Sequence, residues 1–196
     1  ALTREGRLQD ALPFAERGVE LYEQNAELQG TMGYLLAMAD RFPDALPYLQ
    51  RKVELRPDDA HARANLAVAL KRLDRSEEAR EMGESALELE PAQPTAHAIM
   101  AALCRERGDF ERALGHFEKA LERKPDNGSV LFGLYGIKKD VSEEDDVAAI
   151  LATLAAKETI TAEELVQYNF TLANIFDRLK SPERAIFYYK AANDLR

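Results

Sequence analysis

Three basic residues recur at a fixed interval through the middle of the chain. Lys71, Arg105 and Lys139 lie 34 residues apart, and Arg72 stands next to the first of them. If the chain is built from units of that length, stacking would align the three side chains in one row. The row could bind an acidic group or the C-terminal carboxylate of a peptide through charge-assisted hydrogen bonds. The alternative is that these long side chains are solvated and favour the negative ends of their helices.

Other reactive residue types form no recognisable motif. The sequence has no GxxxxGK[ST] loop, no HExxH, no GxSxG and no paired cysteines. His61, His97 and His116 occupy different positions of the 34-residue units, which predicts partly exposed helix residues rather than metal ligands. Cys104 follows Leu70 by 34 residues, so we expect a packing role for it and not a nucleophilic one. We predict no enzyme activity, metal or cofactor for this chain.

The acidic run at residues 143–146 allows two interpretations. Four consecutive carboxylates could bind a cation. Acidic residues in a first helical turn also favour the positive end of the helix dipole while remaining solvated. We expect the second role.

Composition predicts a soluble, folded, cytoplasmic protein. The chain has 196 residues, of which 46% are hydrophobic and 31% charged, enough to form a core. A formal net charge of −9 argues against nucleic-acid binding, which depends on lysine and arginine. No apolar run is long enough to span a membrane, and the N-terminus does not resemble a signal peptide. A single cysteine excludes an internal disulfide.

A period of 34 residues runs through two further residue types. Alanines stand at positions 11, 45, 79 and 113, and prolines stand at 57, 91 and 125. Residues 26–59, 60–93 and 94–127 are therefore predicted to be full helical repeats. Each repeat has an apolar first helix, a turn and a second helix that ends before the proline. The turn is marked by Asp74 and Ser76 in the second full repeat and by Gly108 and Asp109 in the third.

This pattern resembles the tetratricopeptide repeat (TPR) family. The matching small, aromatic and proline positions are Gly33, Ala45, Leu49 and Pro57, then Ala67, Ala79, Ala86 and Pro91, then Ala101, Ala113, Phe117, Ala120 and Pro125. Lys52 replaces an expected alanine, and Gly83 replaces an expected aromatic residue. The resemblance implies an all-α fold. It would be a single right-handed superhelical solenoid over 1–196, with about eleven helices in antiparallel pairs.

The ends and one inner unit depart from the pattern. Residues 1–25 fit the second half of a truncated repeat, which suggests a piece of a longer protein, and 166–196 fit a final repeat. Between them, 128–165 form a degenerate repeat with a first helix at 128–139 and a four-residue insertion. Ser142 and Thr161 are predicted to open helices with capping boxes. Uncapped terminal repeats could expose apolar surface and support a homodimer.

The resemblance implies that a ligand binds on the concave face, at fixed slots of the first helices. Small residues at Gly30, Ala64, Ala98, Ala102 and Gly136 would leave room for an inserted segment. The predicted ligand-binding residues are Tyr34, His61, Asn65, Val68, Lys71, Arg72, Ala102, Arg105, Phe132 and Lys139.

Two functions follow from the resemblance. The first is a non-catalytic interaction module that binds a peptide or a partner domain, through acidic groups if the basic row takes part. The clamp that binds chaperone C-terminal tails is not expected, because Gly30, Tyr34, Thr95 and Ile99 stand at its basic and amide slots. In the alternative, residues 143–196 resemble the last repeats of bacterial TPR-sulfotransferase fusion proteins. The chain would then position a substrate for a larger transferase.

Overall fold

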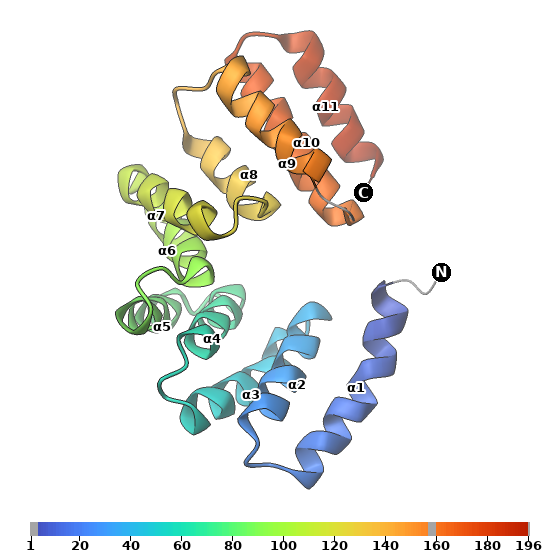
Figure 1. The fold of residues 1–196 in the computed structure, drawn as a ribbon, viewed down its shortest axis with the longest axis vertical. Helices are drawn as coiled ribbons and strands as arrows, with labels where there is room; N and C mark the ends of the chain where they lie inside the picture. The colour runs from blue at the N-terminus through green and yellow to red at the C-terminus, as the bar shows by residue number, and fades with distance from the viewer. Residues whose placement is uncertain (1–3, 157–159, 196) are drawn as a thin grey trace. The chain divides into compact units, whose positions relative to one another are not determined.

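The computed structural model describes residues 4–156 and 160–195, and this part of the chain is all α-helical (Figure 1). Eleven α-helices and one short π-helix, η1, are described, which confirms the predicted fold class and helix number. Their bounds are α1 Arg4–Leu21, α2 Ala26–Met38, α3 Phe42–Leu55, α4 Ala60–Arg72, α5 Ser76–Leu89, α6 Pro94–Glu106, α7 Phe110–Arg123, α8 Gly128–Ile137, η1 Glu143–Val147, α9 Ala148–Ala156, α10 Ala162–Arg178 and α11 Pro182–Asp194.

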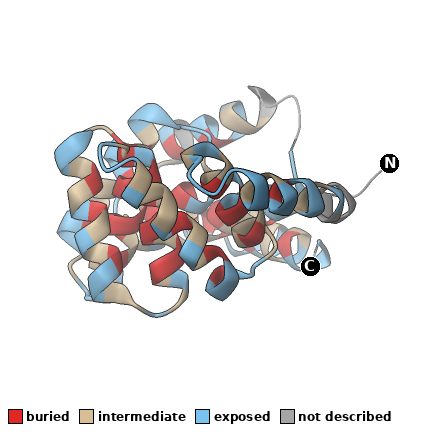
Figure 2. Cartoon of the chain, turned by 90° about the horizontal axis from the view of Figure 1, so that it is seen from below, coloured by how far each residue is buried: buried red, intermediate tan, exposed pale blue. Residues whose placement is uncertain are grey.

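The chain divides within α6 into two compact units, at residues 1–103 and 104–196. In the first unit α1 packs on α2, α2 on α3, α3 on α4 and α4 on α5. In the second unit α7 packs on α8, α8 on α10 and α10 on α11. Figure 2 colours each residue by its burial, and buried residues occur along the packed helices of both units.

The periodic small residues act as close-packing positions, as predicted. Ala45, Ala79 and Ala113 are completely buried. Gly33 lies so close to α3 that an added methyl group would come within 2.8 Å of the Leu49 side chain. The predicted prolines also have the expected effect, since α3, α5 and α7 each end two residues before one.

The two departures from the family pattern are compensated by neighbouring residues. The Lys52 side chain packs over Gly30, where a methyl group would come within 2.4 Å of Cδ. Its ammonium lies 3.5 Å from Asp59 and 3.6 Å from Glu27. Gly83 faces the sulfur of Met100, which fills the space of the expected aromatic ring. The room that we predicted at Gly30 for a ligand is therefore filled by the chain itself.

Each connection between repeats carries a side-chain cap at the same position. The N-cap side chains accept hydrogen bonds from backbone N–H groups of the first turn, which would otherwise lack a helical partner. They are Asn25, Asp59, Gln93 and Asn127, spaced 34 residues apart. Within repeats, Asp40, Asp74 and Gly108 have positive φ angles of 59°, 58° and 78°. Asp109 caps α7 as expected, whereas α5 has no side-chain cap, because its N-cap residue is Arg75 and an arginine side chain cannot accept a hydrogen bond.

A second periodic contact ties the start of each first helix to the preceding connection. Gln29 donates a hydrogen bond to the carbonyl of Glu23, and Arg63 donates to the carbonyl of Pro57. His97 Nε2 lies 2.9 Å from the carbonyl oxygen of Pro91. His97 is buried, so our prediction of partial exposure was wrong for this histidine.

The degenerate repeat differs from the others at the end of its first helix. We predicted a helix to Lys139, but α8 ends at Ile137, since Arg178 of α10 donates to the carbonyls of Tyr135, Gly136 and Lys138. These bonds satisfy carbonyl groups that the end of a helix leaves without partners.

Ser142 and Thr161, which we predicted to open helices, are both N-cap residues. Thr161 forms the expected capping box with Glu164 at the start of α10. Ser142 accepts a hydrogen bond from the Asp145 N–H, but the helix that it opens is η1 rather than an α-helix.

Candidate functional site

The first unit contains a small pocket that joins three of the predicted ligand-binding residues. Tyr34 on α2 and Asn65 and Val68 on α4 line it, with apolar side chains that include Phe42 and Leu49. Its volume is about 200 Å³. Tyr34 is 56% exposed, so its ring can contact a bound molecule. Within the described residues Asn65 makes no side-chain hydrogen bond, which leaves its amide available to a ligand.

Arg72 lies over the ring of Phe42, one of the residues that line this pocket. Its guanidinium carbon lies 4.5 Å from the centre of the Phe42 ring, and its Nη2 lies 2.5 Å from Asp40 Oδ1. Both charged side chains are more than half exposed. The arginine therefore combines a ring contact with an exchangeable surface ion pair.

Two further predicted binding residues, His61 and Lys71, are not among the residues that line this pocket. His61 Nδ1 lies 2.6 Å from the amide nitrogen of Gln93, the buried N-cap residue of α6. Because an amide nitrogen only donates, Nδ1 of His61 accepts this bond. Lys71 is half-buried in the last turn of α4.

The predicted residues of α6 and α8 have surroundings that differ from those of the small pocket. Ala102 and Arg105 are half-buried on α6. The Phe132 ring lies 6.2 Å from that of Phe170, which lies 6.3 Å from Tyr189. Phe132 therefore belongs to an aromatic row that links α8, α10 and α11.

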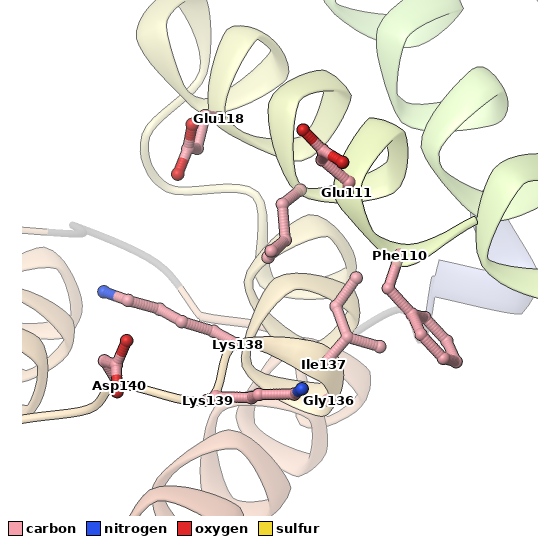
Figure 3. Close-up of a pocket in the computed structure, with 9 residues that line it drawn as sticks. Phe110, Glu111, Glu118, Gly136, Ile137, Lys138, Lys139 and Asp140 are labelled. Carbon is pink, nitrogen blue, oxygen red and sulfur yellow. The ribbon is translucent and has the colours of Figure 1, made fainter. Parts of the chain in front are cut away.

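Lys139 lies beyond the end of α8 and lines a larger pocket, next to α7, that sequence reasoning missed (Figure 3). Lys71 belongs to the first unit, and Arg105 and Lys139 belong to the second. Alignment of the three side chains in one row stays a prediction.

Asp146 is not the solvated helix-end residue that we expected. It is 7% exposed and accepts hydrogen bonds from Tyr135 Oη at 2.8 Å, Lys138 Nζ at 2.7 Å and the Ser142 N–H at 2.7 Å. Burial by itself raises the pKa of Asp146, but these three donors bring it below its ordinary value. Burial, and then Asp146, raises the pKa of the Tyr135 hydroxyl. The acid thus anchors the segment that follows α8.

We searched the described residues for a metal site and for a reactive cysteine. No group of three His, Cys, Asp or Glu side chains in residues 4–156 and 160–195 is arranged to hold a metal ion. Cys104 is half-buried, and burial followed by the charge of Asp109 raises the pKa of its thiol, which disfavours the reactive thiolate. None of the helices in the described ranges is long and apolar enough to cross a membrane.

Three family models match the chain, and all describe the tetratricopeptide repeat. They cover residues 36–103, 94–127 and 166–196, together more than half of the sequence. None concerns a sulfotransferase, so the narrower resemblance stays a prediction. A search of curated protein sequences found no match.

Solved structures share the fold at low sequence identity. A tetratricopeptide repeat protein from Parabacteroides merdae has 17% identity and a TM-score of 0.70, over 98% of this chain and 73% of that one. The APC/C hetero-tetramer Cut9–Hcn1 has 16% identity and a TM-score of 0.79, over 96% and 37%. YrrB, a TPR protein with an unusual peptide-binding site, has 15% identity and a TM-score of 0.54, over 93% and 92%.

Proposed function

Because the chain belongs to the tetratricopeptide repeat family, we propose that it is a non-catalytic module that binds a peptide segment of a partner at the face holding Tyr34, Asn65 and Val68. Repeats of this family generally serve as scaffolds for proteins or peptides. The similar protein YrrB has an unusual peptide-binding site, but at 15% identity the likeness supports only a shared fold.

The pocket shared by these three residues carries the proposal. Small-molecule sites usually span about 300–1,000 Å³, whereas this pocket has about 200 Å³. That volume suits one apolar side chain of an extended segment. The Asn65 amide can both donate to and accept from the peptide backbone, and the Tyr34 ring can cover the inserted side chain.

Basic residues near the pocket favour an acidic group on the partner. A carboxylate could replace Asp40 as the ion-pair partner of Arg72, because that pair is exposed and weak. We extend this proposal to the row of Lys71, Arg105 and Lys139, which would bind further acidic groups of a longer segment.

Selection of peptides from a display library against the full chain, followed by fluorescence anisotropy, tests this function. Tyr34→Ala and Asn65→Ala should each lower the affinity for the selected peptides. The loss should be about tenfold for Tyr34→Ala, as expected for an aromatic anchor. Tyr22→Ala is the matched control, because Tyr22 is 64% exposed and outside the pocket. Equal affinities for all three variants would place binding elsewhere.

Charge reversal tests the basic row separately. Replacing Lys71, Arg105 and Lys139 by Glu should weaken an acidic peptide and reduce the salt dependence of its binding. Unchanged affinity and salt dependence in the triple variant would eliminate the row and leave the pocket proposal standing.

Self-association through the terminal helices is a second way for this chain to act as a binding module. Phe14 on α1 is 80% exposed, and Ile186 and Phe187 on α11 are 52% and 66% exposed. We expect weak dimerisation that Phe187→Ser reduces, measured by light scattering. The transferase-positioning role stays a prediction that the coding sequence after residue 196 would test.

A further inference from the structure

A second pocket lies between α7 and the C-terminal end of α8. It has a volume of about 650 Å³ and an apolar wall formed by Phe110, Leu114 and Ile137. Glu111 and Glu118 stand on either side of Leu114 along one face of α7. Figure 3 shows these carboxylates on the α7 side and Lys139 on the opposite side.

The pocket is open because α8 is short. α8 has 10 residues, whereas the equivalent first helices α2, α4 and α6 have 13 each. Gly136 adds space, since a methyl group there would meet no atom within 4 Å. Phe110 is therefore 52% exposed.

The equivalent aromatic residue in the first unit is covered by an arginine. Phe42 stands two repeat periods before Phe110 and is only 8% exposed. Arg72 lies over its ring and pairs with Asp40. Two periods after Arg72 the sequence has Asp140, beyond the end of α8. The second unit keeps the ring and has an acid where the first unit has the covering arginine.

The charges at the open pocket favour a cation. Glu111, Glu118 and Asp140 line it and form no ion pair within the described part of the chain. The charge of Lys138 is already paired with Asp146, at 2.7 Å. The other charged side chains that line the pocket are three carboxylates and Lys139, so its net charge is negative.

We propose that this pocket binds an arginine side chain of a partner polypeptide, with the guanidinium over Phe110 as Arg72 lies over Phe42. A planar guanidinium can stack on the ring and pair with a carboxylate at the same time, which a lysine ammonium does less well. The aliphatic stem of the arginine would cover Leu114 and Ile137. This site lies in the other unit from the peptide-binding face and selects the opposite charge.

An NMR titration of the full ¹⁵N-labelled chain tests the site with four small probes, the N-acetyl amides of arginine, lysine, citrulline and aspartate. N-acetyl-arginine amide should give saturable shifts at residues 110–118 and 136–140, with a dissociation constant on the order of millimolar. N-acetyl-lysine amide should bind several-fold more weakly. N-acetyl-citrulline amide has nearly the same shape without the charge, so it should give no saturable shifts.

Variants separate the contributions of the ring and the charges. Phe110→Ala should weaken binding of the arginine probe by about fivefold, whereas Tyr22→Ala, at an exposed aromatic residue outside both pockets, should have no effect. The double variant Glu111→Gln and Glu118→Gln should lower the affinity for the arginine probe and reduce the salt dependence of its binding. Lys139→Ala should raise the affinity for the arginine probe. The same change should lower the affinity for an acidic peptide if Lys139 belongs to the basic row.

Four results would overturn the proposal. They are the absence of saturable arginine binding, equal binding of citrulline and arginine, and saturable binding of N-acetyl-aspartate amide at the same residues in place of arginine. The fourth is ligand-free, concentration-dependent shifts at these residues that Phe110→Ala removes and the arginine probe does not compete with. That result would identify a second copy of the chain as the occupant.

Discussion

Phe42 and Phe110 occupy the same position of two repeats and have opposite surroundings. Phe42 is 8% exposed and lies beneath Arg72, the last residue of the 13-residue helix α4. Phe110 is 52% exposed beside a 10-residue helix that Arg178 caps. The two rings stand two repeat periods apart, so they share one position of the repeat. The length of the next helix and one charged residue decide whether that ring is covered.

The largest effect is expected where the segment after α8 is anchored. Asp146→Ala removes the acceptor of three hydrogen bonds and leaves the Tyr135 hydroxyl and Lys138 without their partner. Loss of such a buried charged acceptor should lower the free energy of unfolding by about 2–4 kcal/mol. Urea denaturation followed by circular dichroism measures this change. Asp140→Ala, at an exposed acid of the same segment, should change it by less than about 0.5 kcal/mol. Equal effects of the two variants would refute the anchoring role.

Two glycines of α8 sharpen the contrast between its packed and open sides. A methyl group at Gly133 would come within 2.5 Å of the buried Phe117 ring, whereas one at Gly136 would enter open space. Gly133→Ala should therefore destabilise the protein by about 1–3 kcal/mol through overpacking. Gly136→Ala should be neutral or stabilising by up to about 1 kcal/mol, because alanine favours the helix. Thermal unfolding of the two variants compares them, and the reverse order would contradict the packing described for α8.

Removal of the covering arginine should make the first unit resemble the second. Arg72→Ala exposes the Phe42 ring and frees Asp40, at a cost of about 0.5–1 kcal/mol for an exposed ring contact. N-acetyl-arginine amide should then shift amide signals near Phe42 in an NMR titration, as it should near Phe110 in the unchanged chain. A variant that stays unresponsive near Phe42 would show that an exposed ring and a nearby acid are insufficient.

The smallest effect is a pH dependence shared by the two units. Burial tends to raise the pKa of Asp59 and Asp146, but backbone N–H groups and lysines keep both below the ordinary value. The unfolded pKa of aspartate is about 3.9. A carboxyl with a lower folded pKa stabilises the protein above that pH and loses this contribution as the pH falls through the folded pKa. The free energy of unfolding should thus decrease below about pH 4. Asp146→Asn should make the decrease shallower, and parallel curves would contradict this assignment.

The sequence was sufficient for features that each repeat determines locally. Ala113 and Pro125 have their roles within one helix pair, so their spacing predicted the packing and the helix end. The length of α8 depends on Arg178, which stands more than 40 residues later along the chain. Asp146 was misjudged for a different reason, because its donors Tyr135, Lys138 and Ser142 are nearby in the sequence but reach it only through the turn after α8. The 34-residue spacing of Asn25, Asp59, Gln93 and Asn127 would have identified the caps.

The contact between Gly30 and Lys52 has a consequence for how this sequence can change. Alanine at position 30 would force the lysine stem aside, while alanine at position 52 would leave a void above the glycine and remove the cation beside Asp59. The stem of Lys52 is flexible and can move away from a methyl group at position 30, whereas a shorter residue at position 52 leaves the space above Gly30 empty. A change of Lys52 is therefore expected to accompany a larger residue at position 30 in the history of this repeat.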